Sequence, residues 1–197
     1  MATRRGSLMV GTVLFLFGAA AIVLALVWAM RPAGEAAAPS SVGGPFRLTD
    51  QRGEVVTEET LKGAPFVVFF GFTHCPDICP TTLFEMSEAL GRLGDDAARI
   101  SALFVTVDPE RDTQEVMARY LGSFSPRIRG LTGSATAVDD MVKAYRAYYR
   151  KVPLEGDDYT MDHTAVVYLM DRNGRFVAPL NLDKPADELA AELRRYL

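Results

Sequence analysis

A short apolar segment that leads directly into a pair of cysteines constrains this chain more than any other feature. Residues 66–72 are apolar throughout, begin after Pro65 and end before Thr73, as expected of a buried central strand. Cys75 and Cys79 follow as the only cysteines, and beyond them apolar residues recur at helical spacing. The pattern predicts a strand, a turn and a helix, with both thiols near the helix N-terminus. Free amide groups and the helix dipole bind ligands there and favour thiolate over thiol, so we expect the functional site at this turn.

Pro80 determines the local geometry that we expect at this turn. The residue before a proline avoids the helical conformation, and proline itself is favoured at the first position of a helix. We therefore expect Cys79 at the N-cap and Pro80 at the first helical position. Cys75 would then lie in an irregular turn, so the two sulfur atoms need not share one helix face.

An apolar segment near the N-terminus, residues 8–30, contains no charged side chain. As a helix it would be roughly 34 Å long, which is enough to cross a bilayer. Arg4 and Arg5 precede it, so the positive-inside rule predicts that residues 1–7 are cytoplasmic and that the chain beyond the segment lies outside.

A cleaved signal peptide is the alternative interpretation of this N-terminal segment. Its apolar region would normally be only about 7–15 residues long, so we favour an uncleaved anchor. The N-terminus also lacks the long, Arg- and Ser-rich presequence of mitochondrial import. We therefore expect a single-pass protein of a bacterial inner membrane, with its domain in the periplasm.

The sequence after the apolar segment divides into a linker and a domain. Residues 31–45 are rich in Ala, Gly, Pro and Ser, which predicts a flexible linker ahead of a domain at residues 46–197. Residues 1–30 hold two of the 21 basic side chains and none of the 25 acidic ones, so the remainder has a net charge of about −6. This charge does not favour binding to nucleic acid. A structural disulfide would close only a very small loop and would stabilise little, so we favour a functional cysteine pair.

Within the domain, expected strands alternate with expected helices. We expect strands at residues 46–48 and 55–56 (joined as a hairpin), 66–72, 100–107, 128–131, 164–170 and 176–180. We expect helices at residues 58–61, 81–93, 114–121, from 134 or 136 through 149, and 187–197. Thr113 should cap the third helix, Tyr145 and Tyr149 should lie on the core face of the fourth, and residues 155–162 should form an acidic loop. This alternation predicts a single α/β domain with a central mixed sheet.

Two thiols with three residues between them, together with the distant His163, allow three kinds of chemistry. Thiol–disulfide exchange needs an exposed cysteine of low pKa and a resolving partner, and peroxide reduction needs a similar thiolate in a polarising pocket. Metal binding needs soft donors that converge, and two thiolates with an imidazole suit either copper or zinc. Three ligands without a fourth fit copper, as Cu(I) or Cu(II), better than a closed structural zinc site.

Three motifs along the domain resemble a known family. FGFTHCPDICP (70–80), VDPERDT (107–113) and DHTAVVYLMDRNG (162–174) are similar to motifs of the Sco/SenC family of thioredoxin-like copper proteins. The resemblance covers about residues 44–197, and that family also has a single membrane anchor before the domain. It implies a thioredoxin-like fold, with a central mixed β-sheet flanked by helices and an N-terminal β-hairpin.

The same resemblance implies a function and a ligand set. The function would be copper delivery to the binuclear Cu(A) centre of cytochrome c oxidase during its assembly. By matching motif, the copper ligands would be Cys75, Cys79 and His163.

Other polar residues beside these motifs are candidates for supporting roles. We expect His74 to be structural or to support the ligands, because its side chain should point away from that of the neighbouring cysteine. Asp108 could orient or deprotonate the site or could simply form a strand-end turn, and Asp162 is a further candidate beside His163. The acidic residues ahead of this histidine, between positions 157 and 162, should raise its pKa.

Three functions remain after this comparison of chemistries. The first is a copper carrier, the second a thiol–disulfide reductase acting on the Cu(A) cysteines or other periplasmic thiols, and the third a redox or copper sensor. Thioredoxin-like oxidoreductases usually have two residues between their cysteines and a cis-proline facing them. Here three residues separate the cysteines, and His163 stands where that proline is expected, which favours metal binding. We therefore favour a metallochaperone over an enzyme. Its partners would be the oxidase subunit carrying Cu(A), a periplasmic copper donor and a thiol reductant.

Overall fold

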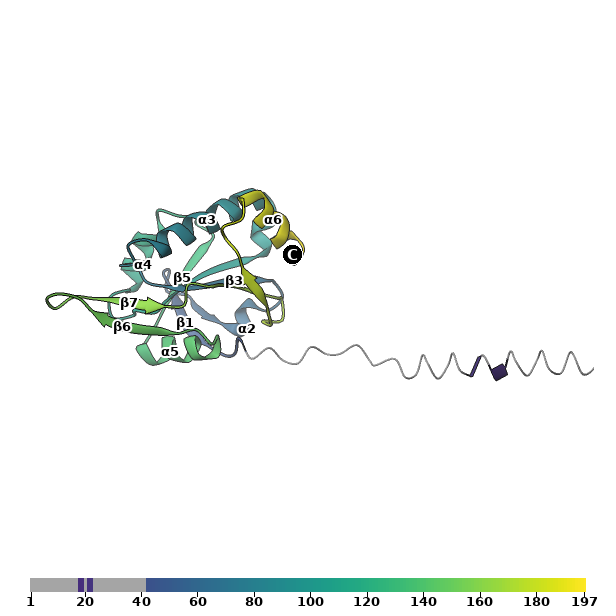
Figure 1. Ribbon diagram of the computed structural model, residues 1–197, viewed down its shortest axis with the longest axis horizontal. Coiled ribbons are helices and arrows are strands. Elements are labelled where there is room, and N and C mark those ends of the chain that lie inside the picture. The colour runs from purple at the N-terminus through teal and green to yellow at the C-terminus, as the bar shows by residue number, and fades with distance from the viewer. Residues whose placement is uncertain (1–17, 20, 23–41) are drawn as a thin grey trace, which may run out of the picture. The chain divides into compact units, whose positions relative to one another are not determined.

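The computed structural model describes residues 18, 19, 21, 22 and 42–197 (Figure 1). The chain divides into two compact units, Met1–Ala38 and Pro39–Leu197. The expected membrane anchor at residues 8–30 and the expected linker at residues 31–45 fall largely outside the described residues. In the part of the chain that the structure describes, no helix combines the length and the apolar character needed to cross a membrane.

A seven-stranded mixed sheet forms the centre of the second unit, in the order β2-β1-β5-β4-β3-β8-β9. Its strands are β1 (Arg47–Asp50), β2 (Val55–Thr57), β3 (Phe66–Gly71), β4 (Ser101–Thr106), β5 (Ile128–Thr132), β8 (Val167–Met170) and β9 (Phe176–Leu180). Strand β3 pairs in parallel with β4 and antiparallel with β8, and all six of its residues are buried. The prediction of a buried central strand before the cysteines is therefore confirmed.

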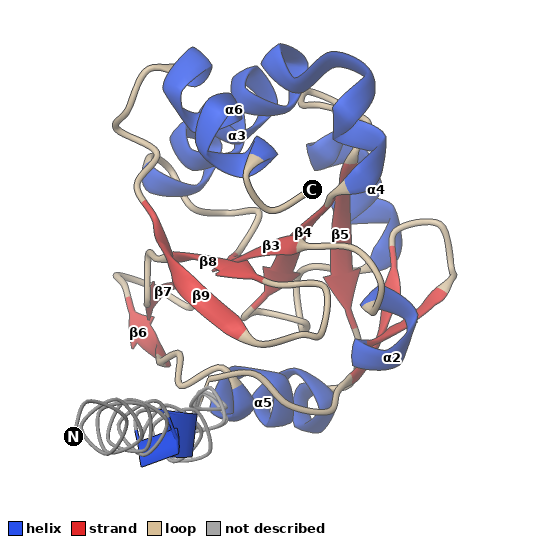
Figure 2. Cartoon of the chain, turned by 90° about the vertical axis from the view of Figure 1, so that its right-hand side faces the viewer, coloured by secondary structure: helices blue, strands red, loops and turns tan. Residues whose placement is uncertain are grey.

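Helices cover both faces of this sheet. They are α2 (Glu58–Leu61), α3 (Ile78–Leu93), α4 (Gln114–Leu121), α5 (Ala135–Ala144) and α6 (Ala186–Arg194), with a 3-10 helix at Gly94–Arg99. Figures 1 and 2 show α3 and α6 together on one side of the sheet and α5 on the opposite side. The side chains of Thr57, Thr113 and Ser134 accept hydrogen bonds from the first turns of α2, α4 and α5, which confirms the predicted cap at Thr113.

The start of α3 differs from the sequence-based prediction. The helix begins at Ile78 with Asp77 at the N-cap, so Cys79 lies inside the first turn rather than at the cap. Pro80 is still compatible with this helix, because the first four backbone N–H groups of a helix need no acceptor within it. The preference of a pre-proline residue for extended backbone is a bias, and here the helix overrides it.

The segment after α5 also differs from the prediction. The helix ends at Ala144, and Arg146 follows with a φ of 54°, a left-handed conformation that cannot continue a helix. Tyr145 is buried as predicted, but Tyr149 begins strand β6 (Tyr149–Pro153) instead of extending the helix.

Strand β6 pairs with β7 (Tyr159–His163) as a separate two-stranded antiparallel sheet. The predicted loop at residues 155–162 is therefore wrong from Tyr159 onward. The two strands could not be predicted from the sequence because charged residues occupy exposed positions of the hairpin and leave no run of apolar residues there. The strand predicted at residues 164–170 is shorter in the structure, because β8 begins only at Val167.

Candidate metal centre

The two cysteines lie where the central strand passes into helix α3. Cys75 is 8% exposed and Cys79 is fully buried, and both are free thiols. The Cys75 N–H donates to the carbonyl of Phe72 over 3.2 Å, which holds the turn. The Cys79 N–H donates to the sulfur of Cys75 over 3.4 Å, so the first turn of α3 directs a backbone donor at that sulfur. This contact holds the Cys75 sulfur against the first turn of the helix.

Gly71, the last residue of β3, provides the space for the Cys79 side chain. A Cβ atom at this position would lie 2.7 Å from Cys79 Sγ and 2.6 Å from Phe104 Cε2. Carbon atoms in contact are normally about 3.5–4.0 Å apart. The absence of a side chain at Gly71 thus allows the buried sulfur to lie against the central strand.

His163, at the end of β7, supplies an imidazole to the same place. Its Nε2 lies 3.6 Å from Cys79 Sγ, and its Nδ1 lies 3.1 Å from the carbonyl oxygen of Thr164. Because a carbonyl oxygen only accepts, Nδ1 carries the proton in this contact, and Nε2 is left with a free lone pair directed to the sulfur. The rings of Phe69 and Phe72 contact the imidazole edge-to-face and fix its orientation further.

The ligand atoms of Cys75, Cys79 and His163 all lie within 4.8 Å of one another. A metal with bonds of about 2.0–2.3 Å holds its ligand atoms about 3.5–4.5 Å apart, so this group fits one ion with little movement. Two sulfurs and one nitrogen are soft to borderline donors, which suit copper or zinc better than calcium or magnesium. The structure therefore brings together the three residues that the motifs implicated.

A pocket of about 330 Å³ opens beside this group, between the cysteine turn and strand β7. Its lining includes Cys75 and His163 as well as the exposed side chain of Ile78. The buried Cys79 does not line it. A partner that approaches through this pocket would reach Cys75 and the histidine first.

Burial dominates the electrostatics of the centre. It raises the pKa of the Cys79 thiol well above its ordinary value, and the nearby Cys75 and Asp112 add to the shift. The prediction that the helix N-terminus favours a thiolate is therefore wrong for Cys79 in the metal-free protein. Burial of the sulfur away from water destabilises the thiolate by more than the helix dipole stabilises it.

Burial also lowers the pKa of His163, against smaller opposing effects of its bond to Thr164 and of Asp162. Asp162 does raise this pKa, as predicted for the neighbouring acids, but burial outweighs it and the net shift is downward. Asp162 points outward, is exposed, and pairs with Arg150 over 3.2 Å, which weakens its influence on the ring. A neutral imidazole is the form that a metal requires.

The candidate supporting residues lie around the centre rather than in it. The His74 side chain is half exposed, and its Nδ1 lies 3.1 Å from Thr73 Oγ1 and 4.0 Å from a carboxylate oxygen of Asp112. Asp108 is buried and accepts a hydrogen bond from the Tyr159 hydroxyl over 2.9 Å. Neither His74 nor Asp108 belongs to the group of three ligand atoms.

Asp112 is a polar residue at the site that the sequence analysis did not single out, although the motif at 107–113 contains it. It is fully buried and accepts hydrogen bonds from the Thr73 N–H over 3.1 Å and the Thr73 hydroxyl over 2.5 Å. The Thr106 hydroxyl donates to it over 2.6 Å. Asp112 therefore holds the turn two residues before Cys75. Only its place in a motif could have indicated this role.

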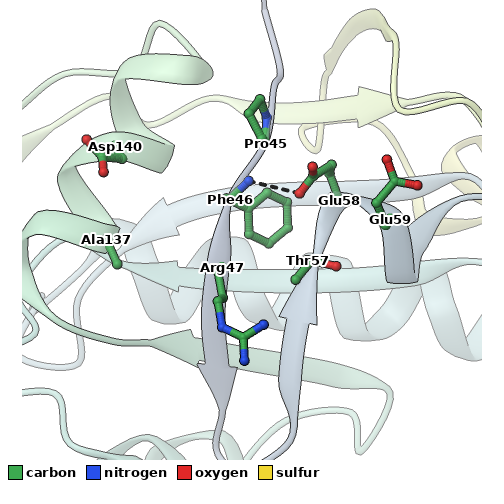
Figure 3. A pocket seen from close by; sticks show the side chains of 8 residues that line it. All are labelled: Pro45, Phe46, Arg47, Thr57, Glu58, Glu59, Ala137 and Asp140. Atoms are coloured by element: carbon green, nitrogen blue, oxygen red, sulfur yellow. Dashed lines mark hydrogen bonds between the residues drawn. The ribbon is translucent and has the colours of Figure 1, made fainter.

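Figure 3 shows a larger pocket, of about 420 Å³, between the start of β1, helix α2 and helix α5. Its lining contains carboxylates but no sulfur or imidazole, and Glu58 Oε2 already accepts a hydrogen bond from the Phe46 N–H over 3.0 Å. Its chemistry does not suit a soft metal, so the candidate centre remains the group at the cysteine turn.

The fold and the three converging donors define a thioredoxin-like domain with a site suited to a soft metal ion. A family model described as SCO1/SenC matches residues 34–197. The human mitochondrial SCO1 homolog is 39% identical over 159 residues, which are 79% of this chain and 53% of that protein. The chain belongs to the SCO1/SenC family. It spans about half the length of this human relative.

Solved structures extend this similarity to the three-dimensional level. The structure of Bradyrhizobium japonicum ScoI with copper bound shares 55% identity and a TM-score of 0.78, over 79% of this chain and 99% of that one. BsSco, a member of the Sco family of cytochrome c oxidase assembly proteins in which a disulfide switch was identified, shares 25% identity and a TM-score of 0.63 over 79% of this chain and 94% of that one. The match covers nearly all of the ScoI chain, so that protein was solved as a domain of about this extent.

Proposed function

We propose that this protein binds one copper ion through Cys75, Cys79 and His163 and delivers it during the assembly of cytochrome c oxidase. The observation that supports this most strongly is the convergence of the three ligand atoms within 4.8 Å, on a domain similar to a ScoI that holds copper. Copper is favoured over zinc because structural zinc takes four protein ligands, and this group supplies three. The open pocket beside Cys75 suits a cargo ion that must be passed on.

The proposal extends to the place of action and to the acceptor. Residues 8–30 would anchor the chain in a bacterial inner membrane, with residues 1–7 in the cytoplasm, residues 31–45 as a linker and the domain at 46–197 in the periplasm. The acceptor would be the oxidase subunit that carries the Cu(A) centre. A periplasmic copper donor and a thiol reductant would act before it.

Metal analysis of the reduced domain, residues 40–197, tests the copper site. We expect about one copper per chain, bound far more weakly after the double substitution Cys75→Ser and Cys79→Ser. Copper binding that is unchanged in the double variant would refute the site. A His163→Ala variant should weaken Cu(II) binding more than Cu(I) binding, because two thiolates alone can hold Cu(I).

A second candidate function is thiol–disulfide exchange, and the contact between the Cys79 N–H and Cys75 Sγ favours it. In this reaction the Cys75 thiolate would attack a disulfide in the partner and form a mixed disulfide. Cys79 would then release the partner as a dithiol, so that two electrons pass to the partner and the pair Cys75–Cys79 becomes a disulfide. The burial of Cys79 suits the second, resolving step.

The His163→Ala variant separates the two functions. Exchange needs only the sulfur atoms, so reductase activity should persist in this variant while Cu(II) binding and oxidase assembly at limiting copper fail. If the variant keeps full copper affinity and full oxidase assembly, the histidine is structural and the reductase becomes the better candidate. A domain exposed to protease on spheroplasts and retained in the membrane fraction would support the proposed topology.

A further inference from the structure

The loop between β4 and α4, residues 107–113, contacts both halves of the candidate metal centre. On one side, Asp112 accepts two hydrogen bonds from Thr73 and so holds the turn that carries the cysteines. On the other side, Asp108 and Arg111 contact Tyr159, the first residue of the strand that ends at His163. One loop therefore holds both the turn that carries the sulfur ligands and the strand that carries the nitrogen ligand.

The contacts around Tyr159 form a compact network with Asp108, which is buried, and Arg111, which is partly buried. The Tyr159 hydroxyl donates to Asp108 Oδ1 over 2.9 Å, and Arg111 Nε donates to the other oxygen of the same carboxylate. Arg111 Nη1 donates to the Tyr159 carbonyl over 2.9 Å. The guanidinium carbon also lies 3.7 Å from the centre of the Tyr159 ring, in a cation–π contact.

Lys151, on the paired strand β6, adds a contact from within the same hairpin. Its amino group lies 4.0 Å from the centre of the Tyr159 ring and pairs with Glu110 over 2.7 Å. The Lys151 and Glu110 side chains are 44% and 65% exposed, so this ion pair contributes little by itself. The buried carboxylate of Asp108 is the stronger attachment, because hydrogen bonds to charged groups away from water are worth the most.

The hairpin needs such an attachment because, in the described part of the chain, its two strands pair with each other and with no strand of the central sheet. β6 and β7 form a two-stranded sheet, separate from the seven-stranded sheet, and Figure 1 shows them extending beside it. A two-stranded hairpin alone is at best marginally stable in water. Alternate residues of a strand share one face, so Tyr159, Met161 and His163 point to the same side of β7. Met161 is buried and Tyr159 is bonded to the loop, so this side faces the domain.

We propose that Asp108, Arg111 and Tyr159 are positioning residues that fix strand β7 and thereby hold His163 against the cysteines. The inference rests on the proposed function in that it takes His163 as a copper ligand. None of the three touches the ligand atoms, so they act through the hairpin rather than on the metal. Loss of the network frees one end of β7, while the other end remains tied by the backbone bond from the Thr164 N–H to the Tyr148 carbonyl.

Two variants of Tyr159 test the network in the domain 40–197. Tyr159→Phe removes the hydroxyl and keeps the ring beneath Arg111, whereas Tyr159→Leu removes both. Tyr148→Leu is the matched control, because this tyrosine adjoins the same hairpin, is 52% exposed and is held there through its backbone N–H and carbonyl.

The first measurement is backbone hydrogen exchange in the metal-free protein, which needs no copper. In Tyr159→Leu we expect exchange of the β6 and β7 amides to accelerate about tenfold, with the amides of β3 and β4 unchanged. Tyr159→Phe should show a smaller acceleration, about threefold, and Tyr148→Leu should match the wild type. Equal exchange in Tyr159→Leu and the wild type would overturn the inference.

The second measurement is Cu(II) affinity together with the nitrogen coupling in the electron paramagnetic resonance spectrum. Tyr159→Leu should weaken Cu(II) binding about tenfold and reduce the imidazole coupling, while Cu(I) affinity changes less than about threefold. Full affinity and full coupling despite a loosened hairpin would also overturn the inference. If His163→Ala itself leaves Cu(II) affinity and coupling unchanged, the proposed ligand is wrong, and the exchange measurement alone decides whether the network holds the hairpin.

Discussion

Replacement of Gly71 by alanine tests whether the central strand and the buried cysteine depend on each other. The added Cβ would lie 2.6 Å from Phe104 Cε2 and 2.7 Å from Cys79 Sγ. Contact distances of about 3.5–4.0 Å require these neighbours to retreat by about 1 Å. Phe104 and Cys79 are both fully buried, and β3 is paired on both sides, so neither the side chains nor the strand has room to move.

The expected cost follows from these contacts. Overpacking of a well-packed core typically costs about 1–3 kcal/mol, and the rigid surroundings of Gly71 place it at the upper end. Alanine also restricts the unfolded chain, which returns about 0.4–1 kcal/mol. We therefore expect a net loss of about 2 kcal/mol in the free energy of unfolding. For a domain of this size, that loss corresponds to a fall of about 4–8 °C in Tm.

Gly91→Ala is the matched control, since this glycine lies in the exposed part of helix α3 and, apart from the adjacent helix backbone, nothing lies within 4 Å of its added Cβ. It should stabilise the domain by about 0.5–1 kcal/mol, opposite in sign to Gly71→Ala. Urea denaturation of the reduced, metal-free domain measures the change in the free energy of unfolding for both variants. Displacement of the sulfur should also weaken copper binding at least tenfold in Gly71→Ala, as changes beside metal ligands do. A Gly71→Ala domain as stable as the wild type would refute this account of the strand.

Three further predictions concern titration and packing. Burial lowers the pKa of His163 below 6.5, so its NMR titration midpoint should fall below that value. Stability should then decrease as the pH falls through about 6.5, where the unfolded imidazole binds a proton first, and His163→Gln should remove this dependence. Burial would raise the pKa of Asp50, but hydrogen bonds from the Glu54 N–H and from Arg129 hold it below 3.8. Asp50→Asn should therefore lower the free energy of unfolding by about 1.5–3 kcal/mol at pH 7. The loss should become smaller as the pH falls below about 4, where the wild-type carboxylate is protonated. Tyr145→Ala should lower the free energy of unfolding by about 3–5 kcal/mol, measured by thermal unfolding, because this buried ring contacts the rings of Phe46, Phe70 and Tyr168.

The elements that the sequence predicted well are those whose environment can be recognised from the local sequence pattern alone. Residues 66–72 are apolar without a break because β3 is buried on both faces, and an unbroken run is the direct consequence. Thr113 is recognisable because a cap depends only on a side chain and the backbone three residues later. The motifs that carry Cys75, Cys79 and His163 are likewise short continuous stretches of sequence, so they can be recognised without knowledge of long-range contacts.

The parts that the sequence did not predict depend on contacts between distant segments. The hairpin of β6 and β7 has polar strands, and its attachment through Tyr159 comes from a loop about 50 residues earlier. No local pattern can indicate such a bond. The end of α5 depends on the backbone of Arg146, a residue type that seldom adopts a left-handed conformation.

For both Cys79 and His163, one physical effect reverses the net pKa shift that the sequence analysis expected. The prediction for Cys79 considered the helix dipole, and the prediction for His163 considered the neighbouring carboxylates, but both omitted burial. Burial favours the neutral form of each group, so it raises the pKa of the thiol and lowers that of the imidazole. The consequences for a metal differ, because the imidazole is already in its binding form whereas the thiol must lose a proton. Copper binding should therefore release a proton from Cys79 at neutral pH, and the charge of the metal must offset the burial of that thiolate.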